Sequence, residues 1–221
     1  MIRYVFLFLF LTVSAFHLYG CIRGKDRLCS FTKPALMPLL AAYYVLGSLP
    51  SPNASLVAAL LFSWIGDVLL MPRGNGWFVA GGIAFTAAHA LFIPAYLPQI
   101  SPGGFSPTAI IPVSAVYCIA AGTVIYVIRN SVQRWMRVPL FLYLICNGAM
   151  NVFALMQLMS VLSTGAIAVY AGAVLFFVSD CTLFFLCFGK KDAKHNMLNF
   201  TVMLTYILGE WLITHGMTMI S

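Results

Sequence analysis

Three carboxylic acids lie inside long apolar segments of the sequence, where acidic residues are rare. Asp67 lies in the stretch SWIGDVLLM, Asp180 lies in LFFVSDCTLFF, and Glu210 lies in the last apolar segment. A carboxylate in such surroundings costs several kcal/mol to keep charged, so it is normally neutralised or used. One neutral and one ionised carboxyl together can donate a proton and stabilise a cation, as in glycosidases. Asp67 and Asp180 are therefore the candidate catalytic pair.

The composition identifies the environment of these acids. Of the 221 residues, 62% are hydrophobic and only 8% are charged, and the mean hydropathy is +0.97. A soluble domain carries roughly a quarter of charged residues. The sequence therefore predicts one all-α integral membrane domain over residues 1–221, surrounded by the lipid bilayer. The net charge of +7 reflects scarce acids, and no Lys/Arg cluster with interleaved aromatic residues predicts nucleic-acid binding.

A transmembrane helix needs about 20 mainly apolar residues. The apolar runs between turn-forming breaks predict eight such helices: 4–21, 34–49, 54–71, 77–97, 108–128, 138–159, 164–188 and 198–219. The first run resembles a secretory signal, and its end at Leu18–Cys21 resembles a lipoprotein cleavage box. Because Tyr19 is bulky and the basic residues follow the run, we expect this first helix to be retained.

Basic residues predict the orientation of the eight helices. The loops after the first, third, fifth and seventh runs contain eleven of the twelve Lys and Arg residues, and only Arg3 lies on the other side. The positive-inside rule therefore predicts that both termini are outside and that these four loops are cytoplasmic. In a bacterium this membrane would be the inner membrane.

The buried polar residues have similar predicted depths. At about 1.5 Å per residue from the cytoplasmic helix ends, Asp67 lies roughly 6 Å deep and Asp180 roughly 12 Å. Asn147 follows at roughly 14 Å, and His89 and Glu210 at roughly 18 Å. One water-accessible cavity that opens to the cytoplasm would satisfy all of these groups.

A purely structural role is open for some of these polar residues. A single Asn or His inside a membrane helix often bonds only a neighbouring helix, which applies to His89, Asn147 and Asn151. It applies less to the two aspartates, because no Lys or Arg lies inside an apolar run to pair with them. Lys33 and Arg137 lie at helix ends, where each can extend to the interface or hold a lipid phosphate.

The cysteines show neither a CxxC motif nor another metal-ligand spacing. Four of the six lie in apolar runs and are expected to be small buried hydrophobic residues: Cys118, Cys146, Cys181 and Cys187. His17 and His215 lie near helix ends, where we expect them at the interface. The sequence therefore predicts no metal site and no disulfide.

The two aspartates have similar sequence surroundings. LFSWIGDVLLM and LFFVSDCTLFF both place a small residue before the aspartate and an apolar run after it. The preceding run starts at Lys33-Pro34 in the first case and at Arg137-Val138-Pro139 in the second. These parallels indicate a four-plus-four parallel repeat, which would bring the two carboxyl groups face to face.

Several motifs occur in a specific order: Lys33-Pro34, Ser63–Asp67, Phe85-x3-His89, Arg137-x-Pro139 with Tyr143, Phe176–Asp180 and Thr205-Tyr206. Together they resemble the lysoplasmalogenase (YhhN-like) family of multi-pass membrane hydrolases over about residues 31 to 215. The resemblance implies hydrolysis of the vinyl-ether bond of lysoplasmalogens, to a fatty aldehyde and glycerophosphocholine or glycerophosphoethanolamine. It also implies that Asp67 and Asp180 are catalytic. Phe92 stands where the family pattern has Tyr, and Glu210 has no clear counterpart.

The resemblance and the buried polar residues together predict a cofactor-free site for a lysophospholipid. The candidate substrate-binding residues are Lys33, His89, Arg137, Tyr143, Asn147, Ser179, Tyr206 and Glu210. A vinyl ether breaks after its outer carbon is protonated, which leaves an oxocarbenium ion that water attacks. Asp180, which is deeper, fits the acid, and Asp67, nearer water, fits the anion that activates this water.

Three other classes of protein remain open. A metal-dependent lipid amidase would need several deep histidines, whereas His89 is the only one here. A proton-coupled transporter would also need paired membrane acids. A structural lipid-binding protein would need no acids at all.

Overall fold

The computed structural model describes residues 2–188 and 195–220, and these residues form an all-helical bundle. The α-helices of this part of the chain are α1 (Ile2–Arg23), α2 (Asp26–Gly47), α3 (Ala54–Leu69), α4 (Asn75–Tyr96), α5 (Pro107–Ile128), α6 (Arg134–Val161), α7 (Thr164–Phe188) and α8 (His195–Ile220). A short 3-10 turn, η1 (Leu97–Gln99), follows α4. The predicted all-α class is confirmed.

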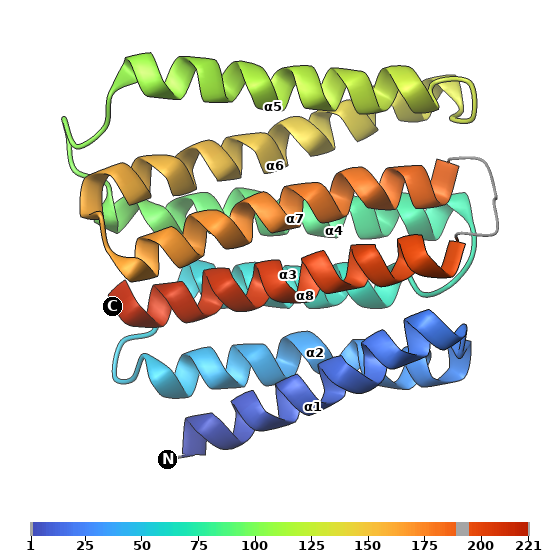
Figure 1. The fold of residues 1–221 in the computed structure, drawn as a ribbon, viewed down its shortest axis with the longest axis horizontal. Helices are drawn as coiled ribbons and strands as arrows, with labels where there is room; N and C mark the ends of the chain where they lie inside the picture. The colour runs from blue at the N-terminus through green and yellow to red at the C-terminus, as the bar shows by residue number, and fades with distance from the viewer. Residues whose placement is uncertain (1, 189–194, 221) are drawn as a thin grey trace.

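The helices lie side by side along the long axis of the molecule (Figure 1). α7 packs on α8 and α3 packs on α4, and these two pairs form the centre, with α6 and α5 on one side and α2 and α1 on the other. α1 begins and α8 ends at the same end of the bundle, while the α1–α2, α3–α4 and α5–α6 turns lie at the opposite end. The described chain therefore begins and ends at the same end of the bundle.

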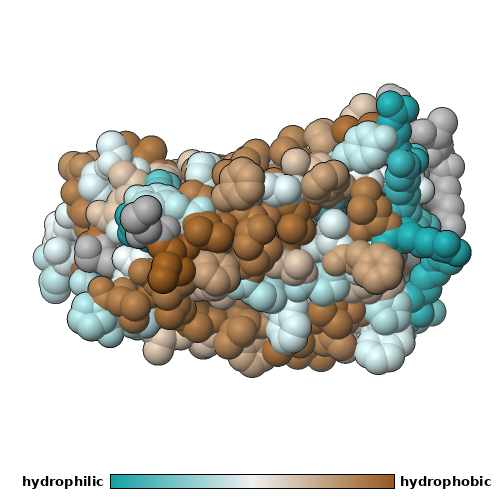
Figure 2. Space-filling model, turned by 90° about the horizontal axis from the view of Figure 1, so that it is seen from below, coloured by the Kyte–Doolittle hydropathy of each residue, from teal (hydrophilic) through white to brown (hydrophobic). Residues whose placement is uncertain are grey.

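Six helices of the described residues are long and apolar enough to cross a membrane: α1, α4 with η1, α5, α6, α7 and α8. α3 is also apolar but has only 16 residues. Figure 2 shows a largely apolar surface over one face, with a hydrophilic rim at the end where α1 joins α2. The protein is an integral multi-pass membrane protein; eight crossings, their orientation and the four-plus-four repeat stay predictions.

α2 begins at Asp26, eight residues before the predicted start at 34. Gly24 has a positive φ of 62°, which suits glycine, and it allows the chain to reverse within a short turn after α1. The next helix therefore starts at once. The prediction that Lys33 precedes the helix was wrong, because Lys33 lies within α2 and has helical backbone conformation. α6 likewise starts at Arg134, four residues before the predicted 138.

Pro34 and Pro38 lie inside α2 without ending it. Pro38 has no N–H group, so the carbonyl of Pro34 lacks its usual donor four residues later. The indole Nε1–H of Trp64 on α3 donates to this carbonyl at 2.9 Å. This bond replaces the missing helical bond and attaches α2 to α3 three residues before Asp67.

α7 and α8 are in backbone contact through glycines. A Cβ atom on Gly172 would lie 2.6 Å from the carbonyl oxygen of Gly209, and one on Gly216 would lie 2.5 Å from that of Gly165. Only glycine permits this separation, as in other closely packed membrane helices. The close contact brings Asp180 of α7 next to the polar face of α8.

Candidate active site

Asp67 is buried and bonded to two other helices. Its side chain is 2% exposed, and its Oδ1 lies 3.3 Å from the Nζ atom of Lys33 on α2. The hydroxyl of Tyr206 on α8 donates to Oδ2 at 2.8 Å. The expectation that no basic residue pairs with the aspartates was therefore wrong for Asp67, because the early start of α2 turns Lys33 inward. Asp67 has a compensating positive charge.

Asp180 has a different set of partners. The side-chain amide of Asn147 on α6 donates to its Oδ2 at 2.6 Å, and Nε2 of His89 on α4 lies 3.4 Å from the same atom. The hydroxyl of Tyr143 interacts with the carboxyl group as a hydrogen-bonding partner. In the described residues, no Lys or Arg forms an ion pair with Asp180. This carboxyl group is surrounded mainly by neutral hydrogen-bonding groups.

A chain of amides sets the orientation of Asn147. Asn151, one turn further along α6, donates to Oδ1 of Asn147 at 2.9 Å, and Tyr117 of α5 donates to Oδ1 of Asn151 at 3.0 Å. The amide oxygen of Asn147 is thus occupied, and its NH2 group faces Asp180. Tyr117 was not among the predicted site residues, because its position in an otherwise apolar helix gives no sign of this contact.

Aromatic rings separate the surroundings of the two aspartates. Phe176 of α7 packs edge-on against His89, with ring centroids 4.8 Å apart, and against Tyr206 at 5.3 Å. Phe85 of α4 packs against both Phe176 and Tyr206. These rings connect Tyr206, the partner of Asp67, with His89, the neighbour of Asp180.

Glu210 is fully buried on the same polar face of α8 as Tyr206. It is close enough to Asp67 and Asp180 to interact with both electrostatically, and Ser63 of α3 lies beside it. Ser179, another predicted binding residue, donates its hydroxyl to the backbone carbonyl of Val202. Ser179 therefore joins α7 to α8, whereas Glu210 belongs to the buried acidic group.

An apolar cavity borders the site between α4, α6 and α7. Its empty volume is about 560 Å³ including its open mouth. Phe85 and Tyr143 form part of its wall and also contact the groups around the aspartates. Met136 and Pro139 lie at its α6 side, and Arg137 lies between them in the chain with its guanidinium bonded to the carbonyl of Arg129. The cavity is suited to a hydrocarbon chain.

The four acidic and histidine side chains of this site do not form a metal-ligand group in the described residues. Three side chains that could together bind a metal ion lie elsewhere in the bundle: His17, Cys21 and Cys29. The sequence predicts no metal site, and this group is a candidate for one that the spacing of the cysteines does not reveal. His17 and Cys21 are four residues apart on α1, which is a helical ligand spacing, but Cys29 comes from α2 and completes the group only in three dimensions.

Comparisons with known proteins show which family the chain belongs to. Lysoplasmalogenases from Mycobacterium bovis (strain ATCC BAA-935 / AF2122/97) and from Mycobacterium tuberculosis (strain CDC 1551 / Oshkosh) are each 29% identical to the chain over 196 residues. The matched region covers 88% of this chain and 72% of each relative. No solved structure matches the chain. The model of the YhhN family matches residues 28–217, which include both aspartates and all their partners, and the chain therefore belongs to the YhhN family.

Proposed function

We propose that the protein is a lysoplasmalogenase, which hydrolyses the vinyl-ether bond of a lysophospholipid inside the membrane. The names of the two mycobacterial relatives indicate this activity for them. For this chain, the main support is the unequal environment of the two buried aspartates. One has a lysine partner, and the other has only neutral donors and a histidine.

Asp67 is the anion of the proposed pair. The ammonium group of Lys33 compensates its charge at 3.3 Å, and the Tyr206 hydroxyl adds a hydrogen bond. A buried carboxylate with a cation and a donor can stay ionised in an apolar medium. It can then stabilise a positive charge that develops nearby, where little water competes.

Asp180 is the proton donor of the pair. Its Oδ2 accepts from Asn147, so the other oxygen can bear the proton. Without a Lys or Arg partner in the described residues, the neutral form is favoured in this buried position. His89, whose ring is held by Phe176 and Tyr143, lies where it can exchange a proton with Asp180.

The substrate fits with its chain in the apolar cavity and its phosphate toward the membrane surface. Tyr143 forms part of the cavity wall and also contacts Asp180, so a vinyl ether beside Tyr143 would lie next to the proton donor. Arg137 lies at the end of α6 near the cavity and can approach a phosphate there.

The reaction then has three balanced steps. Asp180 transfers its proton to the outer vinyl carbon, and the positive charge passes to the inner carbon and the ether oxygen. Water adds to the inner carbon and its proton moves to a carboxylate, which yields a hemiacetal. The hemiacetal hydroxyl gives its proton to a carboxylate as the carbon–oxygen bond to glycerol breaks. The glycerol oxygen takes the proton that the carboxylate pair received from water, and a fatty aldehyde and a glycerophospho-alcohol leave. Asp180 regains its proton at the end of the cycle.

The test is an aldehyde-release assay with the purified protein in detergent. A lysoplasmalogen should yield stoichiometric aldehyde, whereas the matched ester lysophospholipid should yield none, because an ester has no carbon that accepts the proton. Equal release of fatty acid from the ester would indicate a different hydrolase. Absence of any product, with proton uptake into vesicles in the presence of the lipid, would instead favour the transporter.

A further inference from the structure

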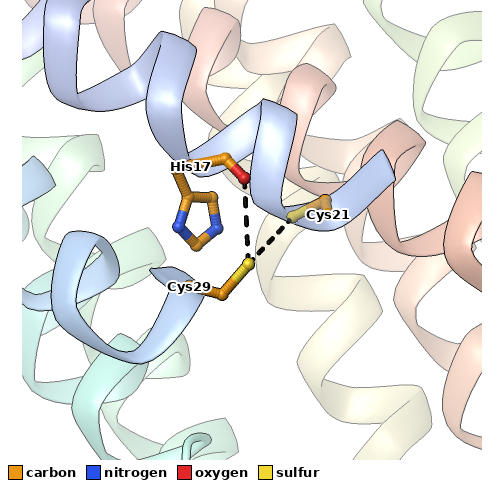
Figure 3. A group of neighbouring side chains, drawn as sticks. All are labelled: His17, Cys21 and Cys29. Atoms are coloured by element: carbon orange, nitrogen blue, oxygen red, sulfur yellow. Dashed lines mark hydrogen bonds between the residues drawn. The ribbon is translucent and has the colours of Figure 1, made fainter. Parts of the chain in front are cut away.

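His17, Cys21 and Cys29 converge where α1 and α2 meet (Figure 3). His17 and Cys21 are each 2% exposed, and Cys29 is half-buried. One ligand atom from each of the three residues lies within 4.8 Å of the others. The two sulfur atoms are 3.8 Å apart, and Figure 3 shows the imidazole ring of His17 facing the sulfur of Cys29.

The sulfur separation is the one that zinc requires. Zinc–sulfur bonds are about 2.3 Å long, so two sulfur ligands of a tetrahedral zinc ion are about 3.8 Å apart. The observed 3.8 Å therefore fits two thiolate ligands of one zinc ion. Gly20 contributes to this fit, since a Cβ atom at that position would lie 2.8 Å from the sulfur of Cys29.

Among the described residues, His17 forms a side-chain hydrogen bond through one ring nitrogen, Nδ1. Nδ1 lies 2.8 Å from the hydroxyl oxygen of Thr32, and this hydroxyl donates its own proton to the carbonyl of Leu28 at 2.8 Å. Thr32 can then only accept from His17, so Nδ1 bears the hydrogen and the lone pair is on Nε2. Histidines that bind metals are normally oriented by such a second bond.

We propose that His17, Cys21 and Cys29 form a zinc site that joins α1 to α2, with water as the fourth ligand. Zn²⁺ binding replaces the two thiol protons, which are released, and the two thiolates cancel the charge of the ion. The neutral group suits apolar surroundings, whereas Cu⁺ would leave a net negative charge. Cys29, which is half-buried, provides the entry path.

A disulfide between Cys21 and Cys29 is the competing outcome. A disulfide needs no third ligand, and it would leave the oriented lone pair of His17 without a function. The site goes beyond the proposed hydrolysis, because within the described residues none of its ligands forms a hydrogen bond or ion pair with the aspartates. Its position is nevertheless informative: Thr32, which orients His17, directly precedes Lys33, the partner of Asp67.

The experiment measures zinc bound to the full-length protein in detergent, under reducing conditions and after removal of loosely bound metal. We expect about one zinc ion per chain, and Co²⁺ should replace it with the near-ultraviolet absorption of thiolate–cobalt bonds. The double variant Cys21→Ser/Cys29→Ser should lose the ion. The matched control, Cys118→Ser/Cys187→Ser, alters two exposed cysteines and should retain it.

Thr32→Val serves as a milder variant if the double serine variant does not fold. It keeps all three ligands and removes the hydroxyl that orients His17, together with the bond of that hydroxyl to the Leu28 carbonyl, so zinc affinity should fall about 10- to 100-fold. Failure of the wild type to bind zinc, equal loss in the Cys118→Ser/Cys187→Ser control, or a Cys21–Cys29 disulfide in the reduced preparation would overturn the proposal. None of these measurements depends on lipid hydrolysis, so the zinc site and the proposed function can fail separately.

Discussion

Lys33 offers the sharpest test of the active-site geometry, because the sequence and the structure assign it different roles. The sequence places it at the cavity mouth as a phosphate ligand, whereas the structure pairs it with Asp67 at 3.3 Å. With an effective dielectric constant of about 20, the attraction at that separation is about 5 kcal/mol. The substitution Lys33→Met removes this charge and keeps most of the side-chain volume.

We expect Lys33→Met to lower both stability and turnover. Removal of one partner of a buried ion pair lowers the free energy of unfolding by roughly 3 to 5 kcal/mol, because the other charge stays buried. Proton uptake by Asp67 would limit the loss, so we expect about 3 kcal/mol, which lowers the melting temperature by roughly 6 to 12 °C. A protonated Asp67 can no longer stabilise the cation, so kcat should fall at least about a hundredfold.

The double variant Lys33→Met/Asp67→Asn separates stability from catalysis. It should regain most of the lost melting temperature, because no unpaired charge remains, but it should stay inactive. Asp67→Asn alone should destabilise less than Lys33→Met, because the Lys33 side chain is 18% exposed and can extend to the interface. Arg27→Met, an exposed basic residue on the same helix, is the matched control and should leave both quantities unchanged.

The measurements are thermal unfolding in detergent and steady-state aldehyde release over a range of lipid concentrations. A normal kcat with a raised KM in Lys33→Met would mean that the ammonium group binds phosphate and does not control Asp67. That result would refute the assignment of Asp67 as the compensated anion.

Three further predictions concern the reaction, the packing and the orientation in the membrane. Asp180→Asn should lower kcat at least about a hundredfold, because the proton donor is lost. The protein should stay folded, as judged by its melting temperature, because Asn keeps the shape of the side chain. Near-normal turnover would shift the search for the acid to Glu210 and His89. Gly172→Val should lower the free energy of unfolding by roughly 1 kcal/mol or more, because the valine side chain would collide with the Gly209 carbonyl. Thermal unfolding measures this loss, and an unchanged melting temperature would contradict the backbone contact between α7 and α8. A cysteine at position 192, which lies outside the described residues, should react with a membrane-impermeant maleimide only after the cells are permeabilised. Labelling of this cysteine in intact cells would reverse the predicted orientation.

The sequence alone determined the membrane class and most helices of this protein. Apolar composition and the length of apolar runs are properties of the chain itself, so they predict α3, α4, α5 and α7 to within a few residues. The same reasoning singled out Asp67 and Asp180, because an acid in an apolar run is unusual wherever the helices pack.

The helix starts were less predictable where prolines and basic residues occur together. Pro34 was taken as the start of the second helix, since proline usually lies in the first turn. α2 instead begins at Asp26, directly after the turn at Gly24, and it continues through both prolines. Trp64 of another helix satisfies the carbonyl that Pro38 leaves without a donor. A donor from a distant segment is not visible in the local sequence.

Only the tertiary structure decided which side chains are partners. Lys33 and Asp67 are 34 positions apart, and Cys29 meets His17 and Cys21 only because a short turn reverses the chain at Gly24. Ser179 resembled a site residue by its place beside Asp180, yet its hydroxyl bonds the backbone of α8. Pairing depends on helix rotation and separation, which arise from packing between helices and not from the residue types along one helix.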